Sequence, residues 1–165
     1  MKEVPTHVRS GGGDQIIVRL ACSDSDLVVF VVFATPPGRL LDGDQILLAL
    51  ALHFKEAGRI PRSAIVALQL AFTERGIMLR RTHVGHTHVA QMMGEYGIAL
   101  GGEPSGNIIF SDVWRNGDSI VTLIEVLSML NETNRTLDDL ADALPMFPSR
   151  TLEVPSRSAG RSNHF

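Results

Sequence analysis

Residues 98–110 read Ile-Ala-Leu-Gly-Gly-Glu-Pro-Ser-Gly-Asn-Ile-Ile-Phe, and this stretch decides how the rest of the chain is interpreted. Two short apolar runs flank the polar segment Gly101–Gly106, which predicts two strands joined by a glycine-flanked loop. The loop presents the carboxylate of Glu103 and the hydroxyl of Ser105. Such a pair offers acceptors and a donor that match the neighbouring hydroxyls of a sugar. The alternative is a purely structural hairpin, in which Glu103 is solvated and Ser105 bonds its own backbone.

Length and composition limit the function classes. The chain has 165 residues, which suits a single domain that buries about 70% of its unfolded surface. Its formal charge of −3 comes without a polybasic patch, so we expect no nucleic-acid partner. One cysteine excludes an intrachain disulfide. The longest apolar run, Leu27–Ala34, is far shorter than the ~20 residues of a membrane helix, and the N-terminus lacks the apolar core of a secretory signal. We therefore expect a cytoplasmic protein without membrane contact.

The pattern of apolar residues predicts alternating strands and helices. Strands are expected at Gln15–Ala21, Leu27–Ala34, Ser63–Leu70 and Ile77–Thr82, and helices at Asp44–Gly58, Val89–Tyr96 and Asp118–Leu130. A last helix should follow a capping box formed by Thr136 and Asp139 and stop at Pro145. This order predicts an α/β fold, a single α/β/α sandwich domain with a mixed sheet flanked by helices.

Two helices allow predictions of their buried faces, and the first also of its cap. Asp44 is expected to cap the first helix, whose core stripe is Ile46, Leu47, Leu50 and Phe54. The segment Asp42–Asp44 is accordingly structural and should not be mistaken for a metal loop. In the helix after Asp118, the residues expected to face inward are Ile120, Leu123, Ile124 and Leu127.

Further motifs surround the opening stretch in a recognisable order. Val84-Gly85-His86 lies one helix upstream, Asn116-Gly117-Asp118-Ser119-Ile120-Val121 opens a helix downstream, and Met146-Phe147-Pro148 closes the segment. Together they resemble the third, sugar-binding domain of the α-D-phosphohexomutases, and most closely that of the phosphoglucosamine mutases. The resemblance covers roughly residues 41–154. It implies that residues 1–40 are the edge of a preceding domain, while composition predicts a disordered tail at 155–165.

The resemblance implies a set of binding residues. Glu103 and Ser105 would hydrogen-bond ring hydroxyls, and Gly102 and Gly106 would let the backbone approach the ring. His86 would donate to a sugar hydroxyl or a phosphate. The basic residue that usually follows it in the phosphoglucosamine mutases is replaced here by a threonine.

Three histidines, His83, His86 and His88, also raise the possibility of a transition-metal site. No carboxylate or thiol lies close by in sequence to complete such a site. We therefore interpret His83 and His88 as exposed residues.

The family's catalytic magnesium loop, Asp-x-Asp-x-Asp followed by Arg, has only a degenerate counterpart here. In the matching stretch, Asp24 and Asp26 remain, but Cys22 replaces the first aspartate and Leu27 replaces the arginine. Magnesium prefers hard oxygen ligands in octahedral order, and a thiolate is a poor substitute. The two carboxylates could hold the ion only loosely, through water.

Three hypotheses follow. The chain is a truncated or divergent piece of a phosphoglucosamine mutase, the family that interconverts glucosamine 6-phosphate and glucosamine 1-phosphate through a phosphoserine. Alternatively, it is a non-catalytic module that binds a hexosamine or hexose phosphate or docks on a mutase chain, or it is a remnant that merely folds. The mutases have four domains, and no residue here matches their nucleophilic serine. We favour the first hypothesis and expect no catalytic residue and no turnover from this chain alone.

Overall fold

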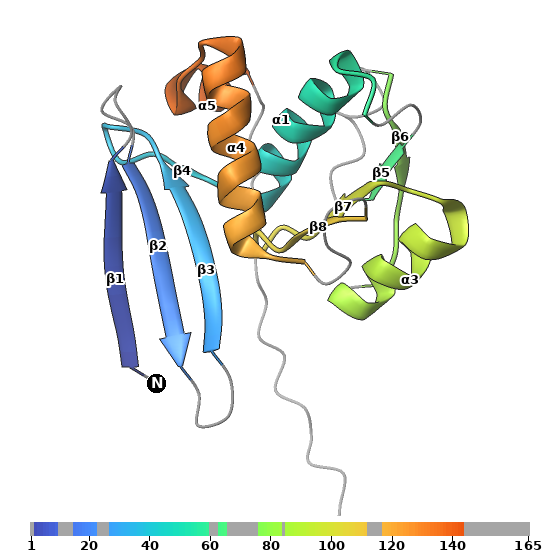
Figure 1. Ribbon diagram of the computed structural model, residues 1–165, viewed down its shortest axis with the longest axis horizontal. Coiled ribbons are helices and arrows are strands. Elements are labelled where there is room, and N and C mark those ends of the chain that lie inside the picture. The colour runs from blue at the N-terminus through green and yellow to red at the C-terminus, as the bar shows by residue number, and fades with distance from the viewer. Residues whose placement is uncertain are drawn as a thin grey trace, which may run out of the picture.

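The computed structural model of the chain (Figure 1) describes residues 2–9, 15–22, 27–59, 63–65, 76–83, 85–111 and 117–143, with side chains for 31–59, 76–83, 85–111 and 117–143. Several predictions lie outside these residues. They concern the strand beyond Ile65, the stop at Pro145, the carboxylates of Asp24 and Asp26, and the tail 155–165.

The N-terminal part forms an antiparallel sheet in the order β1-β2-β3-β4. Its strands are β1 (Lys2–Arg9), β2 (Gln15–Cys22), β3 (Leu27–Ala34) and β4 (Leu40–Leu41). The predictions for β2 and β3 are confirmed, whereas β1, which contains Pro5 and lacks a long apolar run, was not anticipated. After β3 the chain turns at Pro36–Pro37, where the Gly38 N–H donates to the Thr35 carbonyl (2.8 Å).

The second sheet is mixed, with the order β6-β5-β7-β8. It contains β5 (Ser63–Ile65), β6 (Met78–Arg80), β7 (Leu100–Gly102) and β8 (Ile108–Phe110). Strand β5 runs parallel to β6 and β7, while β7 and β8 form an antiparallel hairpin. The predicted strand-loop-strand around Glu103 is therefore confirmed.

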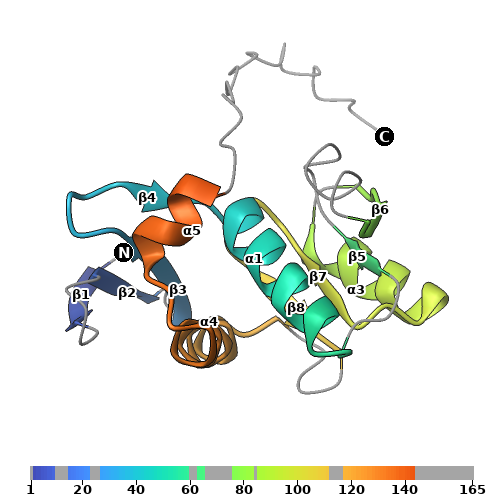
Figure 2. The same ribbon diagram turned by 90° about the horizontal axis from the view of Figure 1, so that it is seen from above.

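Helices α1 (Gly43–Glu56) and α3 (His86–Tyr96) cover opposite faces of this sheet (Figure 2). A Cβ placed on Gly101 would lie 2.6 Å from the Met93 sulfur of α3, and one on Gly102 would lie 3.2 Å from Leu47 of α1. Because neighbouring residues of a strand face opposite sides, these contacts place one helix on each side. The predicted α/β/α arrangement with a mixed sheet is confirmed.

Helix α1 begins two residues earlier than expected. Asp42, not Asp44, is the N-cap: its carboxylate accepts from the Gln45 N–H (2.8 Å), and the Gln45 side chain accepts from the Asp42 N–H (3.2 Å). The prediction of Asp44 was wrong because a capping residue must have extended backbone, as Asp42 has, whereas Asp44 is already helical. The predicted core stripe is confirmed, with all four of its residues at most 2% exposed: Ile46, Leu47, Leu50 and Phe54.

Helix α4 (Ser119–Thr133) packs against both β3 and α1, and Figure 1 shows it between the N-terminal sheet and α1. Its N-cap is Asp118, which was predicted only as the first residue of the helix; its carboxylate accepts from the Ile120 and Val121 N–H groups. The predicted inward face is wrong in part, since Ile120 and Ile124 are 50% and 60% exposed. The residues that are buried instead are Thr122, Val126, Met129 and Leu130.

Helix α5 (Leu137–Ala143) begins with the predicted capping box. The Asp139 N–H donates to the Thr136 hydroxyl (3.2 Å), while the Thr136 N–H and hydroxyl both donate to the Asp139 carboxylate (2.8 Å each). These bonds lower the pKa of Asp139, the backbone bond most strongly. Among the described residues, no helix combines the length and apolar character that crossing a membrane would require.

Candidate functional site

The loop between β7 and β8 is a tight turn that exposes its central residues. The Gly106 N–H donates to the Glu103 carbonyl (3.0 Å), and the Glu103 N–H donates to the Asn107 carbonyl (3.1 Å). Gly106 has φ +91°, a backbone conformation that favours glycine. Pro104 and Ser105 are exposed at the tip, and Glu103 is half-buried. The sequence prediction of a loop that presents Glu103 and Ser105 is thus consistent with this geometry.

The start of α1 lies directly against this turn. The Gly43 N–H donates to the Pro104 carbonyl (3.1 Å), and a Cβ on Gly43 would lie only 2.4 Å from both the Glu103 oxygen and the Gly106 nitrogen. Only glycine permits this approach of two backbones. The sequence predicts only a capping role for residues 42–44. It does not predict the contact of Gly43 with the turn, because nothing local to Gly43 indicates which loop it meets.

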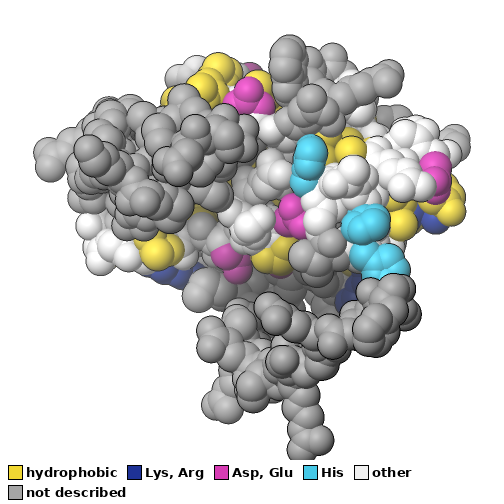
Figure 3. All heavy atoms as spheres, turned by 90° about the horizontal axis from the view of Figure 1, so that it is seen from below, with side chains coloured by type: hydrophobic (Ala, Val, Ile, Leu, Met, Phe, Trp, Pro, Cys, Tyr) yellow, Lys and Arg dark blue, Asp and Glu magenta, His cyan; other side chains and the backbone are white. Residues whose placement is uncertain are grey.

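The start of α3 meets the same turn from another direction. The Gly85 N–H donates to Oε1 of Glu103 (2.8 Å), a bond between residues 18 positions apart. His86 follows Gly85 directly and is half-buried. The two loops singled out in the sequence therefore lie side by side, and Figure 3 shows histidine and acidic side chains on one face of the molecule.

The other glycines near the site have packing roles. Gly102 is buried, and a Cβ there would lie 3.1 Å from the Asn107 carbonyl oxygen as well as close to Leu47. Gly117, just before α4, would bring a Cβ within 2.4 Å of Oδ1 of Asn107. The beginning of a third helix thus also lies beside the hairpin. Gly117 was noted in the sequence only as part of a motif, without this contact.

The remaining histidines are arranged as a pair. The rings of His83 and His88 lie edge to face with their centroids 5.8 Å apart, and both residues are exposed. Within the described ranges, no group of three His, Cys, Asp or Glu side chains is placed to hold a metal ion. The geometry of the described residues therefore does not assign a metal site to this cluster.

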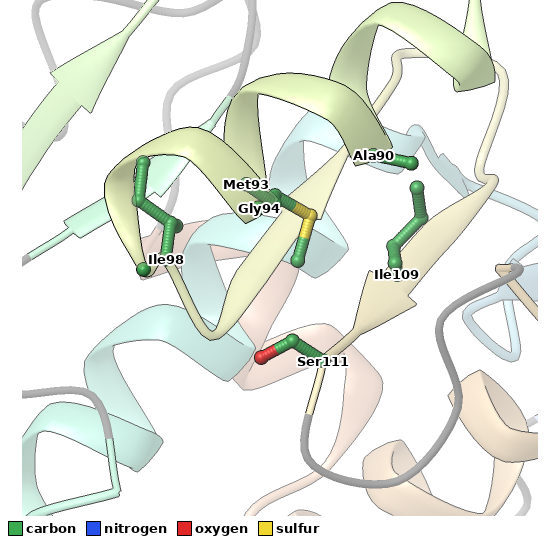
Figure 4. Close-up of a pocket in the computed structure, with 7 residues that line it drawn as sticks. Ala90, Met93, Gly94, Ile98, Ile109 and Ser111 are labelled. Carbon is green, nitrogen blue, oxygen red and sulfur yellow. The ribbon is translucent and has the colours of Figure 1, made fainter.

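Among the described residues, two of the cavities border these elements. A small one of about 110 Å³ lies between β3, the start of α1 and the turn, and Ser105 and Gly106 are among its lining residues. A larger one of about 490 Å³ lies between α3 and β8, lined by Met93, Ile98, Ile109 and small residues (Figure 4). The larger cavity does not include the predicted binding residues, so the candidate site is the surface formed by the turn and the start of α3.

The degenerate metal loop cannot be placed in the same way. Cys22 and Leu27 are directly paired at the end of the β2–β3 ladder, and Asp24 and Asp26 lie outside the described residues. Val84 of the upstream motif also lies outside the described residues.

Sequence comparisons agree with the resemblance. Residues 42–147 match the family described as phosphoglucomutase/phosphomannomutase, alpha/beta/alpha domain III. The phosphoglucosamine mutase of Corynebacterium glutamicum (strain R) is 36% identical over 125 residues, covering 72% of this chain and 28% of that protein. That of Leifsonia xyli subsp. xyli is 39% identical over 124 residues, covering 71% and 27%. The chain spans little more than a quarter of the length of these curated relatives.

Solved structures share the fold. A phosphoglucomutase/phosphomannomutase family protein from Burkholderia thailandensis aligns with a TM-score of 0.61 at 23% identity, over 70% of this chain and 26% of its own. The Aspergillus fumigatus N-acetylphosphoglucosamine mutase, in complex with GlcNAc-6P and magnesium, aligns with a TM-score of 0.56 at 17% identity, over 88% and 36%. From the match over residues 42–147 and the arrangement of α1, α3 and the mixed sheet, the chain belongs to the phosphoglucomutase/phosphomannomutase family, and these residues correspond to its α/β/α domain III.

Proposed function

We propose that this chain is a piece of a phosphoglucosamine-mutase-type enzyme that binds a hexosamine phosphate through Glu103, Ser105 and His86. The observation that carries the proposal is the 2.8 Å hydrogen bond from Gly85 to Glu103, because it brings the two candidate loops together. The names of the relatives and the GlcNAc-6P in the Aspergillus structure support this choice of ligand.

The proposed contacts follow from the donor and acceptor groups on this surface. Oε1 of Glu103 accepts from Gly85, which leaves Oε2 to accept hydrogen bonds from sugar hydroxyls. The exposed Ser105 hydroxyl can both donate and accept, and the His86 imidazole can donate. These groups orient a sugar, and orientation is the contribution of this chain to phosphoryl transfer. The nucleophile and the phosphate-binding groups would come from other parts of a mutase.

Magnesium, present in the Aspergillus structure, does not fit the residues of this chain. The stretch that matches the magnesium loop offers Asp24 and Asp26 together with the thiol of Cys22. Only two of these donors are hard oxygen groups, and the thiol is a poor ligand for this ion. No step of the proposed function therefore uses the metal.

Calorimetric titration with glucosamine 6-phosphate tests the proposal. Loss of a carboxylate that accepts hydrogen bonds from sugar hydroxyls costs about 1.5–3 kcal/mol, so Glu103→Ala should weaken binding roughly 10- to 150-fold. Ser105→Ala should weaken it less, since a neutral hydrogen bond contributes about 0.5–1.5 kcal/mol.

A matched control is Glu95→Ala, which removes an exposed carboxylate from the other end of α3, where it accepts from Gln91. It should leave the affinity unchanged. Equal affinities for the wild type, Glu103→Ala and Ser105→Ala would refute the sugar-binding assignment.

A second candidate function is docking on the remaining part of a mutase, and the exposed isoleucines of α4 favour it. Ile120 and Ile124 lie four residues apart, so they share one face of the helix, and they are 50% and 60% exposed. The chain covers 28% of the C. glutamicum relative, so the rest of such an enzyme is the occupant to test. In size-exclusion chromatography, this chain should co-elute with the remaining part of the mutase, and the double variant Ile120→Glu/Ile124→Glu should not. Absence of co-elution for the wild type would rule the docking role out.

A further inference from the structure

Helix α3 differs from the other helices of the site in how it begins. Asp42 caps α1 and Asp118 caps α4, each through its own side chain. The N-cap of α3 is Gly85, which has no side chain to cap the helix, and its first turn contains no acidic residue. The amides at the beginning of a helix lack intrahelical acceptors, so a group from elsewhere must satisfy them or leave them to water.

Glu103 supplies that group from the hairpin. Its Oε1 accepts from the Gly85 N–H at 2.8 Å, and Glu103 is half-buried at this position. A carboxylate at a helix N-terminus is favoured by the helix dipole, and a hydrogen bond to a charged acceptor is stronger than a neutral one. Glu103 therefore occupies the position of a capping acid, although it belongs to a different element.

The hydrogen bond between Gly85 and Glu103 joins the start of α3 to the β7–β8 hairpin, and different contacts hold these two segments. On the hairpin side, the Gly43 N–H and the close packing of α1 hold the turn in place. On the helix side, Gly85 has φ +127° and ψ 127°, an unusual conformation that only glycine adopts readily. The carbonyl of Gly85 also accepts from the His88 and Val89 N–H groups (3.0 and 3.2 Å), so its orientation determines the first turn of α3.

We propose that Glu103 is a positioning residue, whose Oε1 caps α3 and thereby holds Gly85 and His86 beside the hairpin. This inference deepens the proposed function and rests on it for the role of His86 and of the remaining oxygen, Oε2. It gives the carboxylate two tasks at once: one oxygen orders the neighbouring loop, and the other faces the ligand. A sugar that binds Oε2 would then find His86 already in place.

Amide hydrogen exchange, measured by NMR on the full chain without ligand, tests this role. In Glu103→Ala, protection of the Gly85 amide should fall about 10- to 150-fold, the range expected for a hydrogen bond to a charged acceptor. The His88 and Val89 amides should lose protection in the same direction. Amides in the middle of α4, such as Val126, should be unchanged.

Ser105→Ala is the matched control, because it removes an exposed side chain from the same turn and should leave Gly85 protected. Glu103→Gln keeps a side-chain oxygen and should lose less protection than Glu103→Ala; it also serves if the alanine variant does not fold. Unchanged Gly85 protection in the folded Glu103 variants would overturn the inference. Because no ligand is added, this result is independent of whether glucosamine 6-phosphate binds.

Discussion

The hairpin turn Glu103–Gly106 and the outer face of α4 both lie at the surface, yet the molecule constrains them very differently. The turn receives a backbone hydrogen bond from Gly43 and a second contact through Gly85, and α1 packs against it with no room for a Cβ. The outer face of α4 carries Ile120 and Ile124, which remain half or more exposed.

The difference shows that the exposed fraction of a surface residue does not by itself indicate how many contacts hold that residue in place. At the turn, close contacts between backbones restrict the sequence, although Ser105 at its tip is exposed. On α4, Ile120 and Ile124 are mostly open to solvent. The candidate residues Glu103 and Ser105 thus lie on a loop that other elements hold by direct contacts, an arrangement that is common for binding residues.

The largest expected effect contrasts the two faces of α4. Met129 is 2% exposed, so Met129→Ala should reduce the free energy of unfolding by about 2–5 kcal/mol, whereas Ile124→Ala should change it by about 0.5 kcal/mol at most. Urea denaturation of both variants measures the difference. Equal losses would mean that the outer face of α4 is covered in the folded protein.

A second, smaller effect is expected at the turn. Gly43→Ala would force a Cβ against two backbone atoms at 2.4 Å, so we expect a loss of about 1–3 kcal/mol in unfolding free energy. Gly94→Ala is the matched control, since no atom lies within 4 Å of its Cβ position and it sits within α3. Alanine should stabilise that helix by about 0.5–1 kcal/mol. If Gly43→Ala leaves the free energy of unfolding unchanged, the turn can move away from α1.

The capping box of α5 offers a test by pH. Hydrogen bonds from Thr136 lower the pKa of Asp139 below its ordinary value of 3.8. A carboxyl group with a lowered folded-state pKa contributes stability that is present above its ordinary pKa and is lost as the pH falls through the lowered value. Thr136→Ala removes the side-chain bond, so the pKa of Asp139 should rise toward 3.8 in an NMR titration. Thr133→Ala, whose hydroxyl bonds the Met129 carbonyl instead, should leave it unchanged.

The smallest effect is expected from magnesium. A bound ion stabilises the fold by RT ln(1 + [L]/Kd), which for a Kd of about 10 mM is below about 0.1 kcal/mol at 1 mM ion. We therefore expect no measurable rise in Tm on adding magnesium. A clear rise that Asp24→Ala abolishes would show that the two carboxylates form a site.

Local patterns in the sequence were sufficient for much of the fold. Both strands predicted before residue 40, the capping box of Thr136 and Asp139, and the hairpin around Glu103 are confirmed. Each depends on interactions within a few residues, or on apolar periodicity that one segment carries by itself. The prediction of the inward face of α4 was wrong in part. This helix has apolar residues on several sides, so periodicity does not select one of them.

The sequence by itself determined the α/β class, the places of several strands and helices, and the presence of two polar loops with Glu103, Ser105 and His86. Only the tertiary structure decided that α1 abuts the turn at Gly43, that Gly101 faces α3, and that Glu103 caps that helix through Gly85. The physical reason is the separation along the chain of the residues that interact. Caps, turns and periodicity arise between residues close in the chain, whereas the need for a glycine or a remote acceptor appears only when distant elements pack together.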